Sequence, residues 1–125
     1  MTEIFVFGSN LEGFHGKGAA KAALDYHGAE MGVSEGLTGN AYAIPTKGKL
    51  SQLTQRFTRL ELWQIAAHVA AFKMFAWSRP DLTFKVTKIG CGLAGHRYAD
   101  IAPMFVGAPQ NVKLPPEFQQ VIGGR

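Results

Sequence analysis

The sequence has little cysteine and no long apolar run, and each absence excludes a class of protein. Cys91 is the one cysteine in 125 residues, which excludes an internal disulfide framework and a cysteine-rich zinc site. No apolar stretch approaches the roughly 20 residues of a membrane-spanning helix, and residues 1–10 lack the pattern of a signal peptide. We therefore expect a cytoplasmic protein without a membrane partner.

The sequence also lacks a large net charge. Lys and Arg number 13 against 9 Asp and Glu, so the net charge is +4, and the basic residues never form a run of five. This balance favours anionic partners but does not by itself indicate nucleic acid. The four histidines show no metal-ligand spacing, and we predict neither a metal nor another cofactor.

The chain does have 46% hydrophobic residues. It also has 15 glycines, and this share of glycine is well above the usual one of about 7%. The length predicts one domain over residues 1–125. Apolar runs predict strands at 3–7, 41–44, 84–89 and 111–114, and helical patterns alternate with them at 18–26, 58–79, 99–106 and 116–122. This alternation is typical of an α/β fold with a mainly parallel sheet flanked by helices.

The helix that follows Thr58 has the clearest pattern. Thr58 and Glu61 fit a capping box, and one apolar stripe runs through Leu62, Ile65, Val69, Phe72 and Ala76. We expect this helix to end before Pro80. The other aromatic and histidine side chains on it are interpreted as packing or surface residues: Trp63, His68 and Trp77.

Three predicted strands are followed by unusual segments, at 8–18, 45–47 and 90–95. If these strands are parallel, all three segments meet at one edge of the sheet, where α/β proteins bind ligands. The first segment leads into a predicted helix, and the N-terminus of a helix can bind phosphate. The sequence of this segment matches neither a P-loop nor a dinucleotide-binding fingerprint. The third, with three glycines in six residues, can form an anion-binding nest. Simple structural turns are the alternative for both.

Two side chains in these segments are candidate nucleophiles. Lys47 follows a predicted strand and has Lys49 close by, and a lysine among cations is a possible nucleophile, with a solvated turn lysine as the alternative. Cys91 is a weaker candidate, because a single cysteine without an evident base is more often a small packing residue.

Taken together, these motifs resemble a macrodomain, the ADP-ribose-binding α/β fold. The likeness is nearest to the branch that holds the terminal ADP-ribose glycohydrolases and the macrodomain antitoxins of DNA-ADP-ribosylating toxins. Three stretches carry it: Ser9-Asn10 with His15-Gly16-Lys17-Gly18, then Ile44-Pro45-Thr46-Lys47, then Gly90-Cys91-Gly92-Leu93-Ala94-Gly95. The resemblance covers roughly residues 4–106 and implies a compact three-layer fold with a mixed, mainly parallel sheet.

The resemblance also implies roles. Lys47 would be catalytic, attacking or stabilising the anomeric carbon of the distal ribose, and Asn10 would orient that ribose. Backbone N–H groups of the two glycine-rich loops would hold the diphosphate. The implied ligand-binding set is Ser9, Asn10, His15, Gly16, Lys17, Gly18, Thr46, Gly90, Cys91, Gly92, Leu93, Ala94 and Gly95, without a metal.

Two functions compete on this evidence, and a partner-binding domain that retains the fold without either function is a third option. The first is an ADP-ribosyl glycohydrolase that removes ADP-ribose from a modified macromolecule, a nucleic acid among the candidates; Lys47 favours it. The second is a non-catalytic protein that binds or sequesters ADP-ribose or a related nucleotide-derived signal. Ala94 favours the second, because the protein-directed enzymes of the branch have an aspartate at that position.

Overall fold

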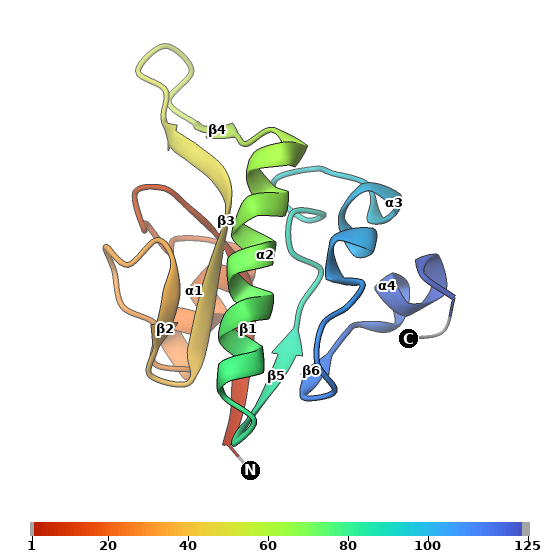
Figure 1. Ribbon diagram of the computed structural model, residues 1–125. Helices are drawn as coiled ribbons and strands as arrows, with labels where there is room; N and C mark the ends of the chain where they lie inside the picture. Colours follow the sequence, from red (N-terminus) through yellow and green to blue (C-terminus); the bar gives the residue numbers. More distant parts are fainter. Residues whose placement is uncertain (1, 124–125) are drawn as a thin grey trace.

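The first strand, β1 (Thr2–Asn10), lies at the centre of the sheet because its side chains are apolar toward both faces. In the computed structural model, which describes residues 2–123, β1 pairs in parallel with β3 (Ala41–Leu50) and with β5 (Leu82–Val86). Beyond β5 lies the parallel strand β6 (Val112–Lys113), and β2 (Gly36–Thr38) and β4 (Phe57–Arg59) pair antiparallel with β3. The strand order is β2-β3-β1-β5-β6, with β4 also on β3 (Figure 1).

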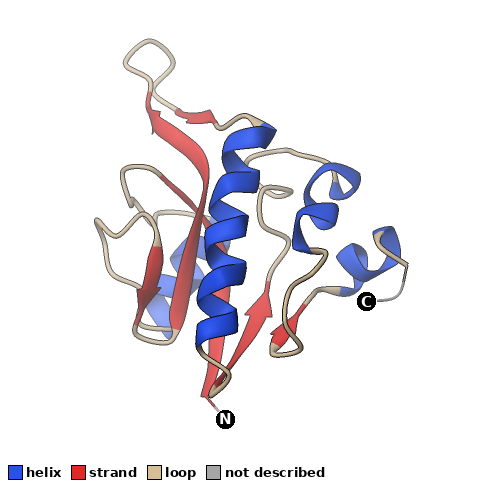
Figure 2. Ribbon diagram, in the orientation of Figure 1, coloured by secondary structure: helices blue, strands red, loops and turns tan. Residues whose placement is uncertain are grey.

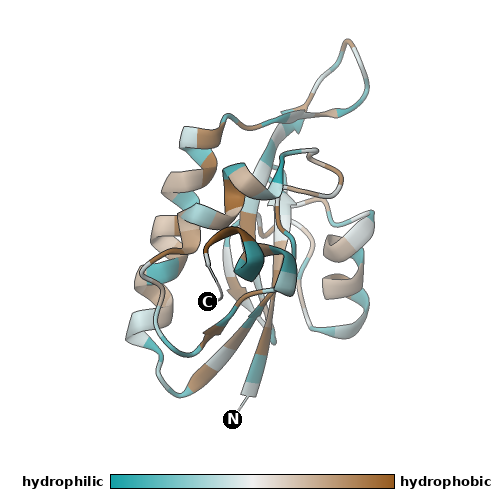
Figure 3. Ribbon diagram, turned by 90° about the vertical axis from the view of Figure 1, so that its right-hand side faces the viewer, coloured by the Kyte–Doolittle hydropathy of each residue, from teal (hydrophilic) through white to brown (hydrophobic). Residues whose placement is uncertain are grey.

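Helices cover both faces of this sheet. The alternation of strand side chains sends Phe5 and Phe7 of β1 toward the alanines of α1 (Gly18–Tyr26), while Ile4 and Val6 pack on the opposite face. That second face is covered by α2 (Leu62–Ser78), α3 (Tyr98–Ile101), the 3-10 helix η1 (Ala102–Phe105) and α4 (Pro116–Val121). The sheet lies between the two helical layers (Figures 2 and 3). The prediction of a three-layer α/β fold with a mixed sheet is thus confirmed.

The apolar stripe predicted for α2 is also confirmed, but the predicted start of the helix is not. Ile65, Val69, Phe72 and Ala76 are fully buried against the sheet. The helix begins after Glu61, which forms a capping box with Gln64: the Glu61 backbone N–H donates to Gln64 Oε1 at 2.8 Å. The predicted box of Thr58 with Glu61 is therefore wrong, because residues 57–59 extend as β4 and pair with β3.

Other strand boundaries also differ from the sequence prediction. The prediction ended the second strand at Pro45, but β3 continues to Leu50, because Pro45 lies at the register shift opposite Ser9 and Asn10, where the ladder is already irregular. Strand β5 covers residues 82–86 rather than 84–89, and β2 lies where the sequence analysis expected neither a strand nor a helix. Within residues 2–123, no helix combines the length and apolarity needed to cross a membrane.

The parallel pairing of β1, β3 and β5 has a direct consequence for function. The segments that follow β1 and β5 and the second half of β3 all lie at the carboxyl edge of the sheet. The expected convergence of the three segments is therefore confirmed, with the difference that Thr46 and Lys47 lie within a strand rather than in a loop.

Candidate functional site

A cavity of about 1080 Å³ opens at this edge of the sheet. Its walls come from four places: the end of β1 with the loop after it, the first turn of α1, the hairpin of β3 and β4, and the loop after β5. Its lining consists of Gly8, Ser9, Asn10, Glu12, Phe14, Gly16, Lys17, Gly18, Ala19, Ala20, Thr46, Lys47, Leu50, Gln55, Arg56, Phe57, Thr87, Lys88, Ile89, Gly90, Cys91, Gly92, Leu93, Ala94 and Tyr98. Most of the predicted ligand-binding residues are thus brought together.

The glycine-rich segments approach one another closely in this cavity. A Cβ on Gly8 would lie 3.1 Å from Thr46 Oγ1 and 3.5 Å from the Gly90 nitrogen, so three segments of the chain meet there. A Cβ on Gly18 would lie 3.3 Å from Leu93 Cδ1, and Gly18 has a positive φ of 60° that disfavours other residues. Glycine at these two positions lets the first and third loops pack together.

The first turn of α1 presents backbone donors to the cavity. Its N-cap, Lys17, makes no side-chain cap hydrogen bond, and the first intrahelical bond runs from the Lys21 N–H to the Lys17 carbonyl at 3.2 Å. The N–H groups of Gly18, Ala19 and Ala20 therefore have no acceptor within residues 2–123. Together with the partial positive charge of a helix N-terminus, they favour an anion.

The loop after β5 presents a second group of donors. Its turn is closed by the Gly95 N–H, which donates to the Gly92 carbonyl at 3.0 Å, and by the His96 N–H, which donates to the Gly90 carbonyl at 2.7 Å. In the described part of the chain, four N–H groups of this loop have no acceptor, those of Gly90, Gly92, Leu93 and Ala94. Such an arrangement is typical of an anion-binding nest.

The charged side chains around the cavity also favour an anionic ligand. Among residues 2–123, four cationic side chains line it, from Lys17, Lys47, Arg56 and Lys88, against one carboxylate, that of Glu12. Partly enclosed cavities lined by one sign of charge concentrate ligands of the opposite sign. The site is therefore suited to an anionic ligand such as a diphosphate.

Carboxylates are almost absent from the cavity. Glu12 Oε2 accepts a hydrogen bond from the Leu50 N–H at 2.6 Å, which ties the first loop to the end of β3. Glu35 pairs with His68 at 2.8 Å and Asp100 with Arg97 at 3.0 Å, and neither acid lines the cavity. Glu12 is the one carboxylate on the lining that the structure describes, and the sequence analysis did not single it out.

Lys47 lies where three strands come together. It is paired with Asn10 of β1 on one side and with Arg59 of β4 on the other, and it is half-buried. Within the described chain, its ammonium group makes no hydrogen bond or ion pair. Strand geometry on both sides fixes its backbone, while its amine is free to act on a ligand in the cavity.

The polar residues at the end of β1 mainly organise the site. Asn10 Oδ1 accepts hydrogen bonds from the Glu12 and Phe14 N–H groups at 3.2 and 3.0 Å, and its amide donates to the Phe14 carbonyl at 2.9 Å. The Ser9 hydroxyl donates to the Ser34 carbonyl. The Thr46 hydroxyl donates to the Ser9 carbonyl at 3.4 Å. These side chains hold the first loop in the shape that exposes its donors.

Two predicted ligand-binding residues, His15 and Gly95, do not line the cavity. His15 is 1% exposed, with its ring edge against Phe7 at a centroid distance of 5.2 Å, so its place is in the packing beneath the first loop. Gly95 closes the second loop, with a φ of 76°. Their contribution is to loop shape.

The buried imidazole of His15 predicts a pH-dependent stability. Burial lowers the pKa of His15 below 6.5, and the neighbouring backbone of Glu30 and Val33 acts in the opposite direction. The unfolded chain thus binds this proton at higher pH than the folded one, so the free energy of unfolding falls as the pH drops below about 6.5. We expect thermal melts to show this loss, and the His15→Leu variant to show a flatter pH dependence. Parallel curves would contradict it.

Cys91 is on the lining but is poorly suited to attack. Burial, with Asp100 adding to it and Lys88 opposing it, raises the pKa of the Cys91 thiol to about 11. The thiol is therefore protonated at neutral pH and is a weak nucleophile. We expect the rate of iodoacetamide alkylation in the folded protein to rise with pH until about 11. A midpoint near that of the unfolded chain would contradict this assignment.

The sequence analysis missed one wall of the site because it missed β4. The hairpin formed by β3 and β4 projects beyond the rest of the molecule (Figure 1) and brings Leu50, Arg56 and Phe57 to the cavity. Phe57 stacks with Phe14 from the first loop, with ring centroids 6.2 Å apart. Short strands such as β4 give almost no periodic signal, so their contribution to a site is seen only in three dimensions.

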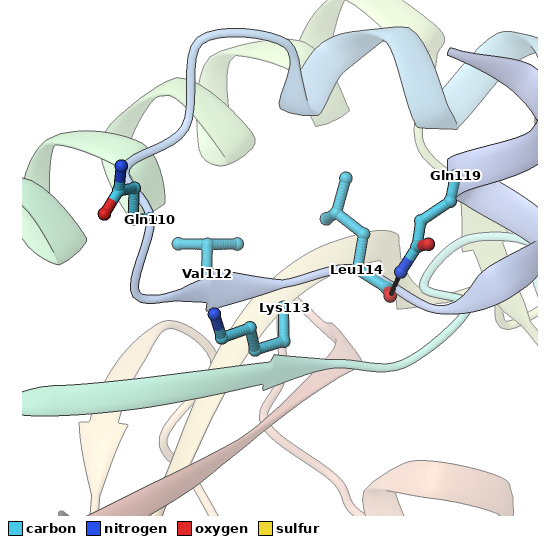
Figure 4. Close-up of a pocket in the computed structure, with 5 residues that line it drawn as sticks. All are labelled: Gln110, Val112, Lys113, Leu114 and Gln119. Carbon is cyan, nitrogen blue, oxygen red and sulfur yellow. Dashed lines mark hydrogen bonds between the residues drawn. The ribbon is translucent and has the colours of Figure 1, made fainter. Parts of the chain in front are cut away.

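A second hollow, of about 340 Å³, lies beside β6 and has a different lining from the first. Gln110, Val112, Lys113, Leu114 and Gln119 line it, and the Gln119 amide donates to the Leu114 carbonyl at 2.7 Å (Figure 4). Its described lining has one cation, Lys113, and no carboxylate, thiol or histidine. Nothing in it supports chemistry comparable to that of the larger cavity.

Comparisons with known proteins bear on the fold. No family model and no curated protein matches the sequence. A solved structure of a protein of unknown function from Bacteroides thetaiotaomicron is similar, with a TM-score of 0.59 and 12% identity over 90% of this chain and 85% of that one. The likeness supports the α/β arrangement of the chain and carries no information about its activity.

Proposed function

We propose that the protein binds ADP-ribose in the large cavity and acts as an ADP-ribosyl glycohydrolase. The observation that carries this proposal is the meeting of two groups of unpartnered backbone N–H donors, at the start of α1 and in the loop after β5, beside Lys47. A diphosphate has oxygens for both donor groups. The donors support a diphosphate ligand, and the resemblance to the macrodomains suggests ADP-ribose as that ligand and a catalytic role for Lys47.

In the proposed reaction, Lys47 acts on the anomeric carbon of the distal ribose. The bond from this carbon to the modified group breaks, and the departing group keeps the electron pair and takes up a proton. In this step Lys47 must be the neutral amine: it either attacks the carbon, giving an adduct that water then hydrolyses, or stabilises with its lone pair the positive charge that develops there until water attacks. In both cases one water molecule is consumed, and ADP-ribose and the unmodified group are released.

The other end of the ligand has a suitable surface in the pair of Phe14 and Phe57. Phe14 is 55% exposed and its ring stacks with that of Phe57 at the cavity wall. Flat aromatic rings are surfaces on which a nucleobase can stack. We infer that the adenine of the ligand would stack on this wall.

A second candidate function is binding without turnover, and the scarcity of carboxylates favours it. Ala94 lies on the lining at the position where the protein-directed enzymes of the macrodomain branch that this sequence resembles have an aspartate. The single described carboxylate of the lining, Glu12, accepts a hydrogen bond from the Leu50 backbone. General acid catalysis would then be weak. In this case the protein would read or sequester ADP-ribose or a related nucleotide-derived signal.

Calorimetric titration with ADP-ribose tests the shared part of both functions. We expect micromolar affinity, about −8 kcal/mol, with weaker binding of AMP, which offers one phosphate to the two donor groups. Absence of heat together with absence of a thermal shift would overturn both. Incubation with ADP-ribosylated protein and ADP-ribosylated nucleic acid then separates the two functions, because only the glycohydrolase releases free ADP-ribose.

A further inference from the structure

The outward face of α2 carries an apolar seam that the site does not use. Trp63, Ala67, Ala70, Met74 and Trp77 are all exposed and follow one another at steps of four, three, four and three residues. The three large side chains are 73%, 74% and 64% exposed for Trp63, Met74 and Trp77. This spacing is that of a coiled-coil contact stripe, and it lies opposite the stripe that packs on the sheet.

The chemistry of this seam is unusual for a solvent-facing helix. Such faces normally carry charged residues, but α2 has a single charged side chain, Lys73, whose ammonium group donates to the Val106 carbonyl at 3.0 Å. Both tryptophans of the chain lie on the seam. Exposed apolar patches mark interaction surfaces, and tryptophan is enriched where binding energy is concentrated.

The order of residues along the seam fits a second copy of the same helix. Trp63 and Trp77 stand seven residues before and seven after Ala70, so the large side chains are placed symmetrically about a small one. If two copies cross antiparallel at Ala70, each Trp63 lies near Trp77 of the other copy, and the contact is self-complementary about a two-fold axis. Alanines at the centre allow the helix axes to approach closely.

The apolar area available on the seam is close to what such a contact needs. At about 150–250 Å² for each aromatic side chain, the exposed parts of the four tryptophans in a dimer offer on the order of 400–700 Å². Met74 and three exposed alanines of each copy, Ala67, Ala70 and Ala71, extend this toward the roughly 1,000 Å² of a specific interface. No residue of α2 lines the large cavity, so this contact leaves that cavity open.

We propose that the protein forms a two-fold symmetric homodimer in which the α2 helices of two copies pack antiparallel and cross at Ala70. The proposal is independent of the ligand in the cavity. Because both tryptophans lie in the contact, tryptophan emission reports its formation directly.

Sedimentation velocity over a range of protein concentrations tests the proposal. We expect a dimer for the native sequence, with tryptophan emission that shifts to the blue as the dimer forms. The Trp63→Glu and Trp77→Glu double variant is expected to be a monomer with an unchanged circular dichroism spectrum, since both side chains are exposed. The matched control Leu53→Glu changes a 93% exposed apolar residue between β3 and β4, outside the seam, and should remain a dimer. A native protein that stays monomeric, or a dimer that survives the double variant, would overturn the proposal.

Cysteine cross-linking tests the antiparallel geometry. With Cys91 replaced by serine, the Ala70→Cys variant should form a disulfide-linked dimer with oxidised glutathione, because the two positions face each other at the crossing. A Ser78→Cys variant serves as the control: it lies eight residues away, about 12 Å along each helix, so the two thiols would be about 24 Å apart. Cross-linking at position 78 but not at position 70 would overturn this geometry.

Discussion

Replacing Lys47 with alanine is expected to abolish the release of ADP-ribose while leaving its binding nearly intact. The donors proposed to hold the diphosphate are backbone N–H groups of the two loops, which the substitution does not touch. We expect the affinity to change by no more than about tenfold, or about 1.4 kcal/mol. Turnover, in contrast, should fall at least about 1,000-fold, which corresponds to about 4 kcal/mol of transition-state stabilisation.

Lys49 provides the matched control for this variant. It has the same charge, lies two residues further along β3, is exposed and does not line the cavity. Lys49→Ala should therefore retain both binding and turnover, which separates the role of the Lys47 amine from a general loss of positive charge. Equal turnover in the native protein and in Lys47→Ala would remove the catalytic assignment. Reduction with cyanoborohydride during turnover tests nucleophilic attack, because a covalent adduct would be trapped on Lys47.

The sequence predicted the fold better than it predicted the walls of the site. The strands at the centre of the sheet have short but recognisable apolar runs, and their parallel order was expected from the helices between them. That order was enough to place residues 8–18, 45–47 and 90–95 at one edge. Composition and spacing thus located the site, because a parallel sheet gathers the carboxyl ends of its strands.

What the sequence could not supply were contacts that depend on weak local signals. Strand β4 has three residues and no periodicity, so the predicted capping box at Thr58 was wrong and the wall formed by Arg56 and Phe57 was missed. Pro45 indicated the end of a strand, but a register shift in the neighbouring β1 accommodates it. His15 looked like a ligand residue because of its neighbours in the loop, yet tertiary packing buries its ring under that loop.

Replacing Gly92 with valine is expected to weaken binding of every diphosphate ligand by at least about 100-fold, or about 2.7 kcal/mol. Gly92 lines the cavity between two of the free N–H donors, and a Cβ there would meet no atom within 4 Å. Its φ is not in the left-handed region, so valine fits the loop without backbone strain. The added side chain occupies the space in front of the donors, where the diphosphate would lie.

The graded control is Gly92→Ala, whose single methyl group enters the same open space and should cost much less affinity than valine does. Both variants are expected to melt near the native temperature, because a Cβ at position 92 meets no atom within 4 Å. Calorimetry with ADP-ribose and with ADP compares them, and the two ligands should lose affinity to a similar extent, since they share the diphosphate. If Gly92→Val binds both ligands as the native protein does, the loop after β5 is a structural turn, and the diphosphate site would have to be sought elsewhere in the cavity.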